Sequence, residues 1–334
     1  MAVSEGRSAP GASLTGFSYG YVLGFVYRIT GSSLLIGSLL SCVAWLASAY
    51  VLRSILRMWR VQEPVQWLAL LVYSVLPSSV LWTSVTLREP YQLLSVNLMV
   101  WATTMIWIRP TVRASGVLLV SAAGGAFLHS TLLALGVVVV GSLLLQAVWT
   151  TAGSRIARAV GVGVIVVGFS IAGVTAFRTL YWNYRVSGGL VNAVALHHQV
   201  GMRFPSRTLY KDISRLESPI GVALYIPVSL WQYLFEPMPW KMNRLIDVGF
   251  LAENVLRAIL IGCALAAVGR LEGASRLQVA ILLAWYLVIE MAWAVGTFNW
   301  GTAARHHLPA TGLLLTAAAA MWSRWPVTAP SAHS

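Results

Sequence analysis

Long charge-free stretches separated by short basic segments dominate this sequence. Residues 29–52 contain no Asp, Glu, Lys or Arg, and residues 114–154 form a second, longer charge-free stretch. A helix rises 1.5 Å per residue, so about 20 apolar residues cross the ~30 Å hydrocarbon core of a bilayer. The first stretch therefore fits one spanning helix, and the second fits two helices with a break at His129. This pattern predicts an all-α fold, a polytopic transmembrane helical bundle.

About nine segments meet the length criterion, within a range of eight to ten. They lie at 33–52, 65–84, 90–108, 114–129, 131–149, 159–177, 248–269, 277–297 and 307–323. Residues 218–235 are also uncharged but contain Pro219 and Pro227. We therefore expect a re-entrant or interfacial segment near 218–240, because irregular backbone is tolerated where protein or water surrounds it. A tenth true span at this place is the alternative, and it would invert the topology of half of the chain.

The same pattern divides the chain into a core and two tails. We expect a flexible N-terminal tail at 1–16, a single transmembrane domain at 17–325 and a C-terminal tail at 326–334. Within the domain, 178–217 is predicted to be an external loop and 218–247 the re-entrant or interfacial region.

Composition supports a membrane protein and excludes other classes. Hydrophobic residues make up 58% of the chain and charged residues 10%, with a mean hydropathy of +0.74. A soluble domain carries roughly 25% charged residues, so neither an ordinary soluble enzyme nor a disordered chain fits. Cys42 and Cys263 lie in apolar runs, and no Cys/His cluster has metal-ligand spacing. We expect no metal site and no cofactor.

The basic residues divide into two groups. Cytoplasmic loops carry an excess of Lys and Arg, and the loops at 53–64, 109–113, 150–158 and 270–276 are all basic. With nine spans and an external N-terminus, all of these loops are cytoplasmic. Eleven further Lys and Arg residues then fall on the outer face. A topology error or pairing with lipid phosphates would explain them, and so would a site for an anionic ligand.

The net charge of +13 would suggest a nucleic-acid partner in a soluble domain. In a membrane protein it indicates orientation and a phosphate-facing site instead, so we expect membrane lipids and no nucleic acid among the partners.

Two charged residues form a very short external turn between the second and third predicted spans. Arg88 and Glu89 precede Pro90, which is favourable at the first helical position. A helix N-terminus also favours an anion such as Glu89. The pair is either a helix cap with a surface ion pair or the mouth of a substrate cavity.

Charged residues inside predicted spans are costly and face a bundle interior or a water-filled cavity. Glu253 and Arg257 lie one helical turn apart in one span and can pair. Glu290 lies in the next span and has no cation near it in sequence. It is either a buried structural partner or a substrate contact or general base. His129 is either a structural residue or a proton carrier.

Two further basic groups are predicted outside. Arg203, Arg207, Lys211 and Arg215 are spaced four apart and would form one stripe on a helix. This stripe would meet lipid headgroups or hold a substrate phosphate. Arg305 and His306 lie just before the last predicted span, either as interfacial anchors or as ligand contacts.

Three short motifs together resemble a known class of proteins. They are Pro-Ser-Ser-x-x-Trp-Thr-Ser leading into Leu-Arg-Glu (77–89), Phe-Glu-Pro-Met-Pro-Trp (235–240) and Asn-x-Gly-Thr-Ala-x-Arg-His (299–306). In this order they resemble bacterial multi-spanning proteins of polysaccharide assembly, over roughly residues 70–325. This class includes oligosaccharide repeat-unit polymerases of the O-antigen type and membrane glycosyltransferases of the GT-C class.

The resemblance implies transfer or polymerisation of a glycan linked to polyprenyl phosphate or diphosphate. The reaction would take place at the extracytoplasmic face of the bacterial cytoplasmic membrane, in a multi-pass protein, alongside other envelope-glycan assembly proteins. Substrate phosphate would be held by a group of external side chains: Arg88, Arg203, Arg207, Arg305 and His306. The base that activates the acceptor hydroxyl would be Glu89, Glu290 or His129.

One feature departs from the GT-C pattern. GT-C enzymes carry an acidic motif in a first external loop, whereas Glu5 and Glu63 are the only acidic residues before Glu89 here. A polymerase-like mechanism without this motif, or an inactive or accessory membrane subunit, stays open. A transporter or flippase for a lipid-linked or anionic substrate is the rival from another class, with Glu253, Arg257 and Glu290 in coupling.

Overall fold

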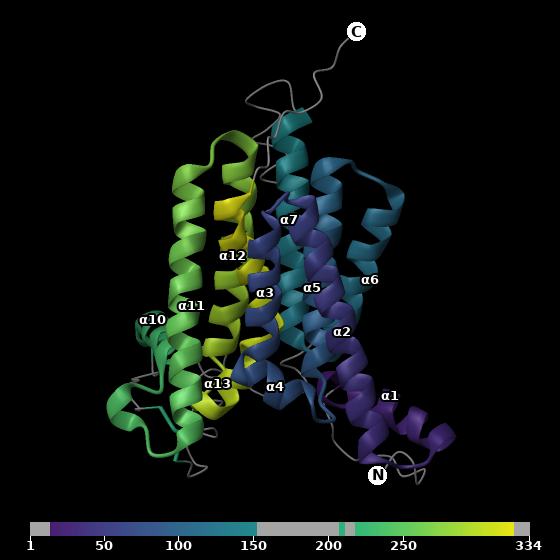
Figure 1. The fold of residues 1–334 in the computed structure, drawn as a ribbon, viewed down its shortest axis with the longest axis vertical. Helices are drawn as coiled ribbons and strands as arrows, with labels where there is room; N and C mark the ends of the chain where they lie inside the picture. The colour runs from purple at the N-terminus through teal and green to yellow at the C-terminus, as the bar shows by residue number, and fades with distance from the viewer. Residues whose placement is uncertain (1–13, 152–206, 211–217, 324–334) are drawn as a thin grey trace. The chain divides into compact units, whose positions relative to one another are not determined.

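The computed structural model of this protein describes residues 14–151, 207–210 and 218–323, and these residues form helices without a β-strand (Figure 1). The α-helices are α1 (Leu14–Thr30), α2 (Leu34–Met58), α3 (Glu63–Val75), α4 (Pro77–Thr83), α5 (Glu89–Ile108), α6 (Val112–Leu128), α7 (Ser130–Thr151), α10 (Pro219–Phe235), α11 (Leu245–Arg270), α12 (Gly273–Ala294), α13 (Trp300–His306) and α14 (Thr311–Ala319). Three single 3₁₀ turns accompany them: η1 (Pro239–Lys241), η2 (Leu308–Ala310) and η3 (Ala320–Trp322).

Five helices in the described chain are long and apolar enough to cross a membrane. They are Leu34–Met58, Glu89–Ile108, Thr131–Val148 within α7, Leu245–Arg270 and Gly273–Ala294. Each corresponds to a span predicted from the sequence. The described part of the chain is therefore all-helical, and its long apolar helices are consistent with a polytopic membrane protein, but the predicted number of about nine spans is not confirmed. The predicted span at 159–177 lies outside the described residues.

The predicted span at 65–84 is not one straight helix. It is divided into α3 and α4, which meet at a bend of 57°. Leu76 lies between them with an extended ψ of 131°. The ring of Pro77 disfavours the helical conformation of the residue before it, which explains the break. A proline in this sequence position is a local signal for the bend.

The predicted span at 307–323 is not one continuous helix either. The chain passes from α13 through η2 into α14 and η3. Pro309 lies in η2, where its missing N–H interrupts the helical hydrogen-bond ladder. All nine residues of α14 are buried. This last helix is a core element rather than a lipid-facing one.

The chain folds into two compact units. Unit 1 contains the described parts of 1–32, 122–236 and 289–303, and unit 2 contains those of 33–121, 237–288 and 304–334. The helices α6, α12 and α13 contribute residues to both units. We describe each unit by itself.

Unit 2 is built around α14, which packs against α2, α3, α5 and α11. The helices α2 and α5 lie side by side (Figure 1). Asn97 on α5 donates a hydrogen bond of 2.8 Å to Ser48 Oγ on α2, and Trp59 Nε1 on α2 donates one of 3.1 Å to Thr104 on α5. From the first of these pairs to the second, the residue numbers increase along both helices, so α2 and α5 run in the same direction. The bent pair α3 and α4 returns the chain between them.

The two ends of unit 2 carry different groups. At one end, Gln62 N donates to Trp322 O, and Arg270 Nη1 donates to Met321 O at 2.9 Å. The turn after α2, the end of α11 and the end of η3 therefore meet there. At the other end, Ser41 and Thr86 connect the start of α2 to the loop before α5 through backbone carbonyls of Leu87 and Leu34. The length of α5 separates these ends by roughly 30 Å.

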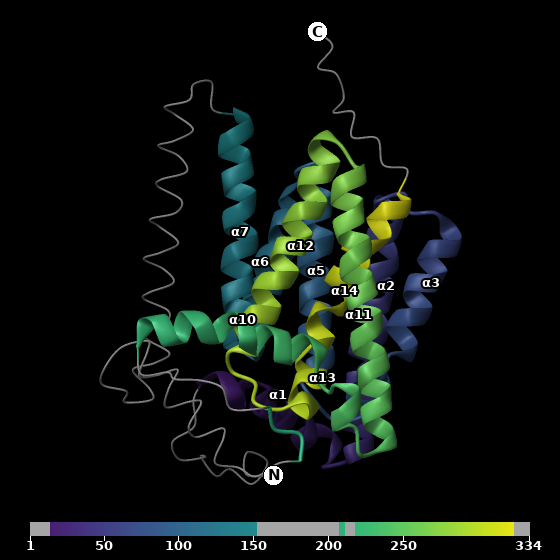
Figure 2. The ribbon, with the colours of Figure 1, turned by 90° about the vertical axis from the view of Figure 1, so that its left-hand side faces the viewer.

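Unit 1 contains a helix with a different direction from the others. Figure 2 shows α10 lying roughly at a right angle to α7. Ser229 Oγ on α10 donates a hydrogen bond of 2.6 Å to Ala294 O at the end of α12. The short segment 207–210 pairs with the chain before α13, because Tyr210 N donates to Phe298 O at 2.9 Å and Trp300 N donates to Thr208 O at 3.1 Å.

The turn after α2 contains a strained residue and gives a stability prediction. Arg60 has a φ of 48°, the left-handed conformation that costs a non-glycine residue about 1–2 kcal/mol. Arg60 N and Val61 N donate to Arg57 O and Leu56 O, so the helix ends in a Schellman motif. We expect Arg60→Gly to raise the unfolding free energy by about 1 kcal/mol, measured by thermal unfolding in detergent.

The matched control for this substitution is Gly273→Ala. Gly273 also has a left-handed φ, of +55°, and a Cβ added to it would meet nothing within 4 Å. Conformation alone should then lower the stability of Gly273→Ala by about 1 kcal/mol. A loss of stability in Arg60→Gly would show that contacts of the arginine side chain outweigh the strain.

Candidate functional site

The first polar cluster consists of Arg88, Glu89 and Arg305, all in unit 2. Arg88 is the N-cap residue of α5 and Glu89 is its first residue, with Pro90 in the first turn. Arg305 comes from the last turn of α13. Its Nε lies 3.0 Å from Glu89 Oε1, and Arg88 Nε lies 4.0 Å from the same oxygen. Two guanidinium groups from distant parts of the sequence thus face one carboxylate.

Burial is unequal in this cluster. The side chain of Glu89 is only 2% exposed, whereas those of Arg88 and Arg305 are 23% and 32% exposed. A ligand arriving from solvent or from the membrane surface therefore meets the guanidinium groups first. The carboxylate lies behind them.

The carboxylate of Glu89 is only partly satisfied. Among the described residues, its Oε2 atom is buried and has no hydrogen-bond partner. Arg305 Nε is buried as well and makes no hydrogen bond of acceptable geometry within that part of the chain, so its 3.0 Å contact with Glu89 is an ion pair. Buried polar atoms without partners are rare in proteins and are a reason to look for a ligand.

The cluster carries an excess of positive charge. Burial lowers the pKa of the Arg88 guanidinium, the charge of Glu89 raises it, and the charge of Arg305 lowers it further. A guanidinium nevertheless stays protonated in proteins, so two positive charges face one negative charge. This arrangement favours an anion, and the planar arginine fork suits the oxygens of a phosphate.

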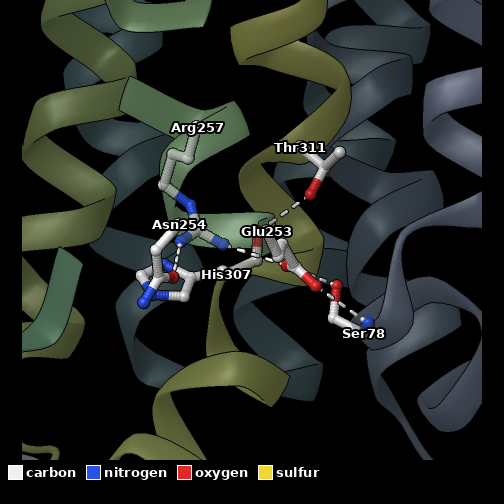
Figure 3. Close-up of polar contacts among 6 residues, drawn as sticks. All are labelled: Ser78, Glu253, Asn254, Arg257, His307 and Thr311. Atoms are coloured by element: carbon white, nitrogen blue, oxygen red, sulfur yellow. Dashed lines mark hydrogen bonds and ion pairs between the residues drawn. The ribbon is translucent and has the colours of Figure 1, made fainter. Parts of the chain in front are cut away.

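A second polar cluster lies deeper in unit 2 and is drawn in Figure 3. Glu253 on α11 accepts two hydrogen bonds from Ser78 at the start of α4, from its N–H at 2.9 Å and from its hydroxyl at 2.7 Å. Arg257 Nη2 donates to Glu253 Oε1 at 3.0 Å, and Arg257 Nη1 donates to Asn254 Oδ1 at 2.5 Å. All four residues are buried.

This second cluster has the chemistry of a structural support. The carboxylate of Glu253 caps the N-terminus of α4, where free N–H groups and the helix dipole favour an anion. Arg257 neutralises it one turn away. Next to these residues, Thr311 Oγ1 donates to His307 O at 3.2 Å (Figure 3). The cluster therefore holds the start of α4, which leads to Arg88, and adjoins His307, two residues after Arg305.

The remaining base candidates lie in the other unit. Glu290 is fully buried in unit 1. His129 Nδ1 accepts a hydrogen bond of 3.1 Å from Thr131 N, and its ring centroid lies 5.9 Å from that of Trp293. This bond leaves the proton of a neutral imidazole on Nε2. The structure does not place either residue with Arg88, Glu89 and Arg305.

The other predicted phosphate contacts are dispersed. His306 is half-buried beside Arg305 in unit 2, and Arg207 is exposed in unit 1. Arg203 lies outside the described residues. No group of three metal-binding side chains occurs in the described ranges.

The sequence gives no role to Ser78, although it lies in the Pro-Ser-Ser motif, and none to Asn254. Ser78 lies 175 residues from Glu253 in the chain, so spacing could not connect them. The available signal was local, because Pro77 is favourable at the first position of a helix, and such a start needs a partner for its N–H groups. Asn254 follows Glu253 directly and falls on the same buried surface.

The described residues thus form an all-helical structure with five helices long and apolar enough to cross a membrane, and with a positively charged polar cluster at one end of unit 2. No protein-family model, curated protein or solved structure matches the chain.

Proposed function

We propose that this protein is a membrane glycosyltransferase or polymerase that acts on a polyprenyl-phosphate- or diphosphate-linked glycan at the extracytoplasmic face. The observation that carries the proposal is the meeting of Arg88 and Arg305 at the buried carboxylate of Glu89. Guanidinium groups can stabilise the charge that develops on a leaving phosphate, and a carboxylate can take the proton of an acceptor hydroxyl.

The distribution of charge in unit 2 supports the outer face. Arg60 and Arg270 lie at the end where the turn after α2, the end of α11 and the end of η3 meet. Arg88 and Arg305 lie at the opposite end. If the first end is cytoplasmic, as the excess of basic residues in predicted cytoplasmic loops indicates, the phosphate site faces outward.

The proposed chemistry uses the cluster as follows. The bond between the sugar anomeric carbon and the carrier phosphate oxygen breaks, and a bond forms between that carbon and an acceptor hydroxyl oxygen. The hydroxyl proton passes to Glu89. The negative charge left on the carrier phosphate is stabilised by Arg88 and Arg305. Among Glu89, Glu290 and His129, Glu89 is the base candidate in the same unit as both arginines.

Reconstitution in lipid vesicles tests the proposal. The vesicles receive a polyprenyl-phosphate-linked or polyprenyl-diphosphate-linked oligosaccharide and an acceptor glycan, and elongation is followed by mass spectrometry. We expect Arg305→Gln to lower the elongation rate by about 10²–10³-fold, the effect of removing one donor that stabilises a developing oxyanion. Glu89→Gln should lower it by about 10²–10⁴-fold.

Arg276→Gln is the control, because this variant removes an exposed arginine at the start of α12. Its elongation rate should equal that of the unchanged protein. Wild-type vesicles that move the carrier across the bilayer without elongating it would contradict a transferase.

One structural feature favours a transporter or flippase as the second candidate. The pair α3–α4 in unit 2 is a broken helix, and the 3₁₀ turn η2 separates α13 from α14. Discontinuous helices with charged groups near their ends are typical of substrate sites in transporters. The vesicle experiment separates the two functions, because transport relocates the intact carrier whereas transfer changes its glycan.

A further inference from the structure

The contact between Arg305 and Glu89 has unusual geometry for a permanent ion pair. Arg305 Nε lies 3.0 Å from Oε1 without a well-aligned hydrogen bond in the described chain, and Arg88 Nε is beyond hydrogen-bond distance at 4.0 Å. By contrast, Glu253 in the same unit is held by two hydrogen bonds from Ser78 and one from Arg257. Glu89 is therefore held mainly by charge attraction, and Glu253 by directed bonds.

Arg305 has donors to offer a ligand. Glu89 is its one ion-pair partner among the described residues, and the approach uses Nε. The two terminal nitrogens remain for an incoming anion, and the side chain is 32% exposed. A phosphate can accept two parallel hydrogen bonds from a guanidinium, and such charge-assisted pairs are among the strongest polar contacts in proteins. A phosphate is thus a better partner for Arg305 than the poorly aligned carboxylate.

We propose, on the basis of the proposed function, that Arg305 changes its partner when the carrier phosphate binds. Its guanidinium moves from Glu89 to the carrier phosphate, and this movement uncovers the Glu89 carboxylate. Before binding, the base is buried behind both arginines and cannot reach an acceptor hydroxyl. After binding, the unpartnered Oε2 and the released Oε1 can accept that hydroxyl. The site is then ordered: the lipid-linked phosphate binds first and the acceptor second.

Order of this kind has a chemical use. A base that is covered until the glycosyl phosphate is in place cannot activate water or another hydroxyl beside an empty site. The same two arginines therefore serve as the phosphate contact and as the cover of the base. The exchange needs side-chain motion in Arg305 but no change in the support formed by Glu253 and Ser78.

Two measurements on the purified full-length protein in detergent test the exchange. In the first, farnesyl phosphate is titrated, with farnesol as the uncharged control. In the second, a water-soluble carbodiimide and glycine ethyl ester label accessible carboxylates, located by mass spectrometry. Labelling is compared in sulfate, which offers tetrahedral anionic oxygens without consuming carbodiimide, and in chloride at equal ionic strength.

We expect farnesyl phosphate, but not farnesol, to bind in an Arg305-dependent way. Sulfate should raise the labelling of Glu89 about fivefold or more, the range of a typical coupling between two sites. The labelling of exposed Glu63 and of buried Glu253 should stay constant. In Arg305→Gln, Glu89 should be labelled strongly in chloride and sulfate alike. The Arg305→Lys variant keeps the positive charge and serves as the control for a folding defect in Arg305→Gln.

The two proposals fail separately. If farnesyl phosphate binds through Arg305 but sulfate leaves the labelling of Glu89 unchanged or lowers it, the exchange is wrong and the phosphate site stands. If binding of farnesyl phosphate is equal in the wild type, Arg305→Gln and Arg88→Gln, the phosphate site itself is wrong, and the exchange fails with it.

Discussion

Gly312→Ala is expected to lower the thermal unfolding midpoint of the protein more than any other glycine substitution in the described chain. A Cβ at this position would lie 2.0 Å from Asn97 Oδ1 and 2.7 Å from its Cγ, closer than real Cβ contacts allow. Gly312 is in the fully buried helix α14, and Asn97 is 0% exposed. Neither side can move into open space.

The position of Asn97 is fixed by hydrogen bonds. Its Nδ2 donates to Ser48 O at 3.2 Å and to Ser48 Oγ at 2.8 Å, and Tyr73 OH donates to the same Oγ at 2.8 Å. Making room for a methyl group would break part of this network. Overpacking costs about 1–3 kcal/mol, and each lost hydrogen bond adds about 1 kcal/mol. The higher helix propensity of alanine returns about 1 kcal/mol, so we expect a net loss of roughly 3 kcal/mol.

Two further variants make this result specific. Gly262→Ala on α11 adds a methyl group that meets nothing within 4 Å, so it should leave stability unchanged or raise it by up to about 1 kcal/mol. Adding Asn97→Ala to Gly312→Ala should recover part of the loss, because the clash disappears with the amide. Equal unfolding midpoints for Gly312→Ala and Gly262→Ala would contradict the close approach of α5 and α14.

The second large effect is expected for Glu253→Ala. This substitution removes both hydrogen bonds that Ser78 donates and leaves Arg257 buried without its carboxylate partner. Breaking a buried ion pair by removing one partner costs about 3–5 kcal/mol. We therefore expect a loss of stability in this range, measured by thermal unfolding in detergent.

A double-mutant cycle separates the charge from the cap. Glu253→Ala combined with Arg257→Met should be less destabilised than Glu253→Ala alone, because no uncompensated charge remains. Ser78→Ala should cost about 1.5–3 kcal/mol, the value of a lost hydrogen bond to a charged group. Glu272→Ala removes an exposed carboxylate after α11 and serves as the control. If the double variant were as unstable as both single losses added together, the two residues would not interact.

Much of the fold could be predicted from the sequence because hydrocarbon thickness fixes the length of a spanning helix. The segments predicted at 90–108 and 131–149 agree with α5 and with the span inside α7 to within a few residues. The breaks at Leu76 and around Pro309 were not predicted. Hydropathy alone does not register a bend, since both halves of a broken helix remain apolar.

The candidate site could be predicted only as separate residues. Arg88, Glu89 and Arg305 were each singled out by a local feature, but their meeting depends on how α5 and η2 pack together in unit 2. The same holds for Glu253, whose pairing with Arg257 follows from helical spacing while its bonds to Ser78 do not. Contacts between distant segments require the tertiary structure, which periodicity does not encode.

The complete burial of α14 has a consequence for how the protein is made. Nine residues of helix span about 14 Å, too little to cross a bilayer as an independent inserted segment. In the chain, α14 follows every other helix that surrounds it in unit 2. During synthesis these earlier helices are made before residues 311–319, so they cannot yet pack against α14. Assembly of unit 2 therefore has to be completed after translation of its last helix, and a nascent chain halted before that point would expose Asn97 and its hydrogen-bonded partners to the membrane.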